Sequence, residues 1–139
     1  MSFRTVVFAG IIVFFILFGS ASGQVPDPHE RAFSVSLIRL IANPQIYDGR
    51  RVGVAGYVDH NGLDTAVGLY VTELDGRNYI LSNSIDLNVE DSKIERAIHK
   101  YAILVGTYHA PKGRLADYLN GNLSNVSVTK AWSSGDVTK

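Results

Sequence analysis

Cysteine is absent from this chain of 139 residues, so no disulfide can hold the fold and no lipid-modified cysteine can anchor it. An excess of positive charge is also missing, because 13 Lys and Arg are balanced by 13 Asp and Glu. Electrostatic binding of nucleic acid needs a clustered basic surface, which this balance opposes. The sequence therefore favours a domain that is stabilised by its hydrophobic core.

The longest apolar run is short for a membrane span. It covers the thirteen residues Val6 to Phe18, whereas a membrane-spanning helix usually needs roughly 18 or more. Arg4 precedes this run and the small residues Ala21-Ser22-Gly23 follow it, which is the layout of a secretory signal. We expect residues 1–23 to be removed before Gln24, leaving a periplasmic or secreted protein with no stable membrane span. An uncleaved membrane anchor is the alternative.

The 116 residues after the predicted signal fit one compact domain. Two prolines predict a flexible segment over residues 24–34, and residues 133–139 have the composition of a frayed C-terminal tail. The stretch Val35–Ala42 has a wide apolar side and Ser36 as a candidate N-cap, which predicts a short helix. Pro44 should end that helix.

Five stretches carry the pattern of β-strands. They are Arg50–Asp59, Val67–Thr72, the stretch around Ile85, Leu87 and Val89, Ala102–Ala110, and Leu123–Val128 with an irregularity near Asn125. The first stretch places three valines and Gly56 on one face. A glycine inside a strand suggests the bulge or sharp coil that lets one strand serve both halves of a barrel.

Helical spacing returns over Glu90–Tyr101, with Ser92 and Glu95 as a capping box, whereas residues 74–82 are expected to be irregular. The order of three strands, a helix and two strands is that of a five-stranded OB barrel. We therefore predict a mainly β domain over residues 35–132. It would be an OB-like barrel with a helix between strands three and four and an extra N-terminal helix. An open α+β sheet with the same elements is the alternative.

A turn motif carries a resemblance to known proteins. The stretch Val35–Val58, with an Asn-Pro-x-x-Tyr-Asp-Gly turn at Asn43–Gly49, resembles a family of uncharacterised exported bacterial proteins. The similarity continues over Leu69–Tyr70, Asn83–Leu87 and Tyr101–Tyr108. This resemblance implies a fold related to the tRNA-anticodon-binding OB domains, and it implies no activity. The turn residues themselves have structural roles.

OB barrels usually bind ligands on the face of the second and third strands, between the loops that follow strands one and four. The candidate binding residues there are His60, Asn61, Asp64, Tyr70, His109, Lys112, Arg114 and Tyr118. Tyr70 should lie on the outer face if Leu69 and Val71 belong to the core. Aromatic and basic residues together can stack a base or a sugar ring, although half-buried tyrosines and solvated loop charges give the same pattern.

Catalytic signatures are missing from the sequence. The four histidines form neither a His-x-His pair nor a His-Glu-x-x-His helix, and there is no Gly-x-Ser-x-Gly elbow. A zinc site built from His60, Asp64 and His109 is the remaining route to a small metal-dependent hydrolase. We expect a non-enzymatic exported module without a cofactor, which recognises a protein or a cell-envelope polymer. A single-stranded nucleic-acid-binding OB domain is the alternative, favoured by fold analogy and opposed by charge.

Overall fold

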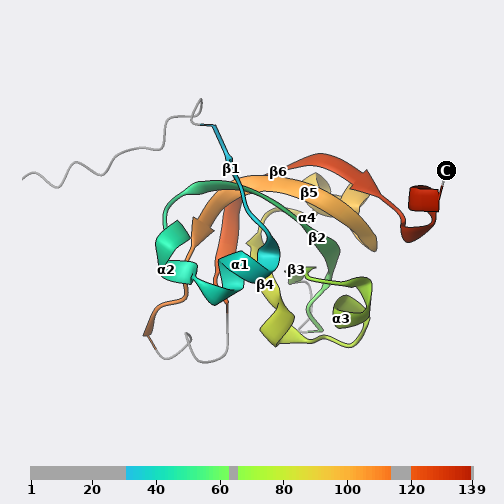
Figure 1. Cartoon of the computed structure of the whole chain (residues 1–139). Helices are drawn as coiled ribbons and strands as arrows, with labels where there is room; N and C mark the ends of the chain where they lie inside the picture. The colour runs from blue at the N-terminus through green and yellow to red at the C-terminus, as the bar shows by residue number, and fades with distance from the viewer. Residues whose placement is uncertain (1–30, 63–65, 114–119, 139) are drawn as a thin grey trace, which may run out of the picture.

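The computed structural model describes residues 31–62, 66–113 and 120–138, so the predicted signal over residues 1–23 lies outside the described residues. The strands in these ranges are β1 (Phe33–Ser34), β2 (Arg51–His60), β3 (Val67–Tyr70), β4 (Ser84–Asn88), β5 (Lys100–His109) and β6 (Asn122–Trp132) (Figure 1). The helices are α1 (Leu37–Ala42), α2 (Pro44–Tyr47), α3 (Glu73–Arg77) and α4 (Asp91–Ile94), and η1 (Leu81–Asn83), η2 (Glu95–Ala97) and η4 (Ser134–Thr138) are 3-10 turns. None of the described helices has the length and apolarity that crossing a membrane requires.

Five of the strands close into a barrel. Their order is β2-β3-β4-β6-β5, and β5 pairs back to β2. The pairing of β4 with β6 is parallel and the other barrel pairings are antiparallel. The predicted mainly β fold, a five-stranded OB-like barrel, is thus confirmed, and the open α+β sheet is wrong. One addition is β1, which pairs in parallel with β2 outside the barrel.

β2 serves both halves of the barrel, as its glycine predicts. Its residues 51–58 pair with β5 and residues 57–60 pair with β3. Gly56 stands just before the changeover, where an added Cβ would lie only 2.6 Å from the carbonyl oxygen of Tyr70. The register of β2 runs through this point without a shift, so glycine is needed for the close approach of β3 and not for a bulge.

The core fills the barrel and extends under α1. Val52, Val54 and Val58 on the inner face of β2 are at most 1% exposed, which confirms the alternation seen in the sequence. Leu40 of α1 is fully buried, and this helix contacts β2 and β4. Ser36 caps α1 as predicted, because its side-chain oxygen accepts a hydrogen bond from the Arg39 N–H at 3.3 Å.

The predicted helix over Glu90–Tyr101 is much shorter in the structure. Only α4 and the 3-10 turn η2 form, and Glu90 is the N-cap without a side-chain hydrogen bond, so the predicted capping box at Ser92 is wrong. The chain becomes extended at Ile98, and His99 adopts a positive φ of 59°. This reversal lets the His99 N–H donate to the carbonyl of Val58 and brings the next residue into β5. Tertiary strand pairing therefore overrides the helical spacing.

A capping box occurs instead at α3, in the stretch predicted to be irregular. The Thr72 side chain accepts a hydrogen bond from the Asp75 N–H at 3.1 Å, and the Asp75 carboxylate accepts one from the Thr72 N–H at 3.0 Å. The two bonds satisfy main-chain groups at the start of a helix of five residues. The helix over residues 73–77 therefore overlaps the stretch that was expected to be irregular.

Both ends of the described chain have secondary structure or contacts beyond the predicted elements. Phe33 belongs to β1, within the segment expected to be flexible, and β6 runs on to Trp132. The Trp132 ring stacks on Tyr101, with centroids 6.2 Å apart. In the predicted tail, the Ser134 hydroxyl donates to the carboxylate of Glu73 at 2.8 Å. The expected irregularity at Asn125 is confirmed by its positive φ of 50° and a register shift against β5.

Candidate functional site

Tyr70, one of the two tyrosines predicted to bind ligand, is buried. Tyr70 has 0% exposure, so the expectation that it is available on the outer face is wrong. Its ring lies close to Gly68, where an added Cβ would be 3.0 Å away, and its O–H donates to the carbonyl oxygen of His60 at 3.3 Å. Burial, together with the carboxylates of Asp59 and Asp86, raises the pKa of Tyr70 to about 12. These contacts give Tyr70 a structural role.

The connection between β3 and β4, residues 71–83, covers this side of the barrel. α3 lies directly against β2, since a Cβ added to Gly76 would be 2.9 Å from the ring of Tyr57. Further along, the Tyr79 ring lies 3.1 Å from the position of a Cβ on Gly62. Figure 1 shows α3 beside β2 and β3, which it contacts. The chain itself therefore covers the part of this side next to Tyr57 and Gly62, close to the surface on which OB barrels bind nucleic acids.

A half-buried carboxylate lies at the centre of this covered face. Asp86 and Asp59 are the register partners of Gly68 on its two sides. Burial raises the pKa of Asp86, and a hydrogen bond from the Asn61 side chain opposes the rise. Asn61 is only 9% exposed, and its N–H donates to the carbonyl of Ala66. Asn61, which was also predicted to bind ligand, therefore forms hydrogen bonds within the protein.

We expect Asp86→Asn to raise the melting temperature at neutral pH by a few degrees. A carboxyl whose pKa is higher in the folded protein than in the unfolded chain costs stability when it is ionised. Asparagine is uncharged and still accepts the hydrogen bond from Asn61. As the pH falls through the raised pKa of Asp86 towards the ordinary value of 3.8, the wild-type carboxyl becomes protonated. The difference in melting temperature between the wild type and the variant should therefore shrink.

Thermal unfolding of both proteins at several pH values between neutral and acidic tests this expectation. Glu95→Gln, at an exposed position of η2, is the control for removal of a carboxylate charge. A D86N variant that melts below the wild type at neutral pH contradicts the prediction.

His60 lies at the C-terminal end of β2 beside His99. Their ring centroids are 6.1 Å apart, and Asp59 accepts a hydrogen bond from the His60 N–H at 2.8 Å while lying 3.2 Å from His99 Nδ1. Nδ1 of His60 is buried and has no hydrogen-bond partner among the described residues. A hollow of about 390 Å³ adjoins His60, Ile94 and Glu95. Within the described ranges, no three histidine or carboxylate side chains are grouped so as to hold a metal.

His109 and Lys112 lie at the other end of the barrel. Because β2 and β5 run antiparallel, their last residues His60 and His109 are about ten residues, or roughly 30 Å, apart along the ladder. One zinc ion cannot contact both at this separation, which opposes the zinc site that was left as a remote alternative. His109 instead forms a hydrogen bond with the Ser124 hydroxyl at 2.7 Å, and the exposed Lys112 ammonium lies 3.7 Å from the Asp48 carboxylate. The predicted residues Asp64, Arg114 and Tyr118 lie outside the described residues.

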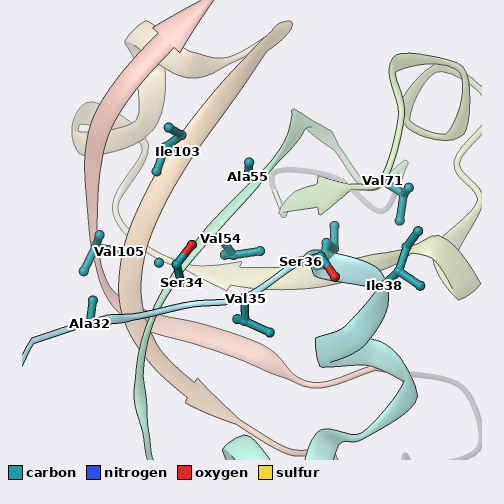
Figure 2. Close-up of a pocket in the computed structure, with 12 residues that line it drawn as sticks. Ala32, Ser34, Val35, Ser36, Ile38, Val54, Ala55, Val71, Ile103 and Val105 are labelled. Atoms are coloured by element: carbon teal, nitrogen blue, oxygen red, sulfur yellow. The ribbon is translucent and has the colours of Figure 1, made fainter.

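An apolar groove of about 600 Å³ lies where β1 and α1 pass over β2 and β5 (Figure 2). Its lining residues are Ala32, Ser34, Val35, Ser36, Leu37, Ile38, Gly53, Val54, Ala55, Val71, Ile103 and Val105, and none is charged. In Figure 2, Ile103 and Val105 on β5 stand at one side and Ile38 and Val71 at the other. Ala55 lies between them and is exposed, and Ile38 is 63% exposed. The groove can therefore receive an apolar group from outside.

The sequence contains two signals for this groove. The apolar side of Val35–Ala42 is wider than the barrel can cover, because α1 buries only Leu37 and Leu40 and leaves Ile38 outside. The outward positions Gly53 and Ala55 of β2 carry small side chains, which leave the floor of the groove low. Neither signal specifies a groove until β1 is known to pair with the edge of β2.

No protein-family model matches the chain, and neither a curated protein nor a solved structure matches it. The fold is therefore described by its own strand order, and the family resemblance suggested by the turn at Asn43–Gly49 stays a prediction.

Proposed function

We propose that this protein is an exported, non-enzymatic OB-like module that binds a protein ligand through the apolar groove. The groove is the single observation that carries the proposal. Its volume of about 600 Å³ is within the usual range of roughly 300–1,000 Å³ for ligand pockets. Its uncharged lining and the exposed Ile38 favour an apolar partner surface. Export rests on the signal layout of residues 1–23, as does the envelope location.

The groove favours a protein over the envelope polymer and the nucleic acid. Glycans and nucleic acids present hydroxyl or phosphate groups, which need polar or cationic partners. The groove offers two serine hydroxyls, and Ser36 uses its own to cap α1. Close to the groove, α3 packs against Tyr57 and the Tyr79 ring lies against Gly62, so the chain itself covers this part of the surface. A protein ligand with exposed apolar side chains suits these observations better.

Site-specific photocrosslinking in the source organism tests this function. A photoreactive amino acid at Ser34, an exposed residue on the rim of the groove, should yield one dominant protein adduct. Ile38→Asp should reduce that adduct about tenfold or more, because it places a charge in the apolar contact. The yield is measured on blots of the purified protein.

The matched control is Ile46→Asp. Ile46 lies on α2 outside the groove and is 61% exposed, close to the 63% of Ile38. The two variants therefore make the same chemical change at similarly exposed helical positions, and I46D should leave the adduct unchanged. Equal loss in both variants, or no protein adduct from Ser34, would reject the proposed function.

A further inference from the structure

One main-chain edge of β2 is open inside the groove. The Gly53 carbonyl accepts a hydrogen bond from the Val35 N–H at 3.0 Å, so Gly53 directs its main-chain groups away from β5. Along a strand, successive residues point their N–H and C=O groups to opposite edges. The N–H and C=O groups of Ala55 and Tyr57 therefore point to the same edge as those of Gly53. Tyr57 pairs there with Tyr70 of β3. Ala55 lies between these two pairings, and among the described residues no strand partner stands beside it on this side.

The open edge and the apolar walls require the same kind of ligand. The N–H and C=O of Ala55 can both form hydrogen bonds with the main chain of another extended polypeptide. The side chains around them, Ile38 and Val71 on one side and Ile103 on the other, match an apolar side chain. A folded apolar surface would satisfy the walls and leave the edge of Ala55 unpaired.

We propose that the ligand enters the groove as a short extended segment whose main chain pairs with Ala55 between β1 and β3. The segment would place one large apolar side chain between Ile38 and Ile103. This inference rests on the proposed function and specifies the form of the protein ligand. Between the pairing of β2 with β1 and its pairing with β3 there is room for one residue pair, so a segment of a few residues is long enough to fill the gap. Pairing of this kind adds a strand segment to an exposed sheet edge.

The partner is a separate molecule in this proposal. β1 reaches the groove at Ala32 and continues through it into α1, so the described chain next to the groove is already placed. The residues before β1 include Gln24–Glu30, whose two prolines lack the N–H that pairing requires. A synthetic peptide with the sequence of Gln24–Glu30 tests this point as a competitor.

The probe is a linear peptide selected from a phage-displayed random library on the immobilised protein. Its affinity is measured by fluorescence anisotropy, together with a series of synthetic versions that carry one N-methyl group at each peptide bond in turn. We expect a shared large apolar residue, and we expect one methylated version to bind about tenfold or more weakly, because it lacks the N–H that donates to Ala55. Versions methylated at neighbouring, outward-facing bonds should bind within about threefold of the parent, well under that tenfold step.

Two variants of the protein complete the experiment. Ala55→Pro removes the N–H on the open edge and should weaken the parent peptide about tenfold or more, and Ile38→Asp should do the same by charging the wall. The methylated series gives the answer even if A55P does not fold. Peptides that require Ile38 but tolerate every methyl group overturn the paired strand and leave the proposed function standing. Failure to select any peptide, or competition by the Gln24–Glu30 peptide, also overturns the inference.

Discussion

Replacing Gly56 by alanine should destabilise the protein by about 3 kcal/mol, at the upper end of what overpacking a core usually costs. The new Cβ would lie 2.6 Å from the carbonyl oxygen of Tyr70 and 2.8 Å from Cγ of Leu69. The first of these atoms belongs to the main chain of β3, so it can move only if β3 moves away from β2. Because β3 is buried along its whole length, that movement would open the core. Domains of this size are stable by roughly 5–15 kcal/mol, so the loss is large.

The same substitution at Gly53 is the matched control in the same strand. An added Cβ there meets its nearest atom, Cγ2 of Val105, at 3.7 Å, which is ordinary van der Waals contact. We expect Gly53→Ala to change the free energy of unfolding by no more than about 0.5 kcal/mol. Urea titrations of both variants measure the difference. Similar losses at the two positions would show that the approach of β3 is not what requires glycine.

Leu40→Ala should cost about 2–5 kcal/mol of folding free energy. Leu40 has 0% exposure although it belongs to α1, which precedes the barrel in the sequence. Removal of its side chain leaves a cavity beneath the helix, next to β2 and β4. A loss of this size would show that α1 is a part of the domain core and not an appendage.

Ile38→Ala, on the same helix, is the control for this change. Ile38 is 63% exposed, and alanine is at least as good a helix former as isoleucine, so we expect a change within about 0.5 kcal/mol. Chemical denaturation followed by far-UV circular dichroism compares the two variants. If L40A proves as stable as I38A, α1 does not contribute to the core as the structure indicates.

Strand pattern and order could be predicted from sequence because one face of each barrel strand is buried. The valines of β2 alternate with smaller or polar residues, and this period of two specifies both the strand and its inner face. Gly56 was informative for the same reason, since a glycine among buried valines marks a close approach of another strand. These local signals were enough for the OB-like order of elements.

Features that depend on contacts between distant segments could not be predicted in this way. His99 takes a positive φ because its N–H bonds to β2, so the periodicity after Ile94 no longer indicates a helix. Alternation placed Tyr70 on the outer side of β3, but it could not show that residues 71–83 fold back over that side. The groove at Ala55 likewise depends on where β1 leaves β2 and β3 joins it.

The position of β6 in the sheet has a consequence for the order in which the chain folds. β6 comes last among the described strands, and it is the strand that joins β4 to β5. Until residues 122–132 have left the ribosome or crossed a membrane, β4 and β5 each keep an unpaired edge. The barrel therefore closes only after nearly all of the described sequence is available. Under the proposed export, late closure of the barrel would keep the polypeptide unfolded while it passes through the channel.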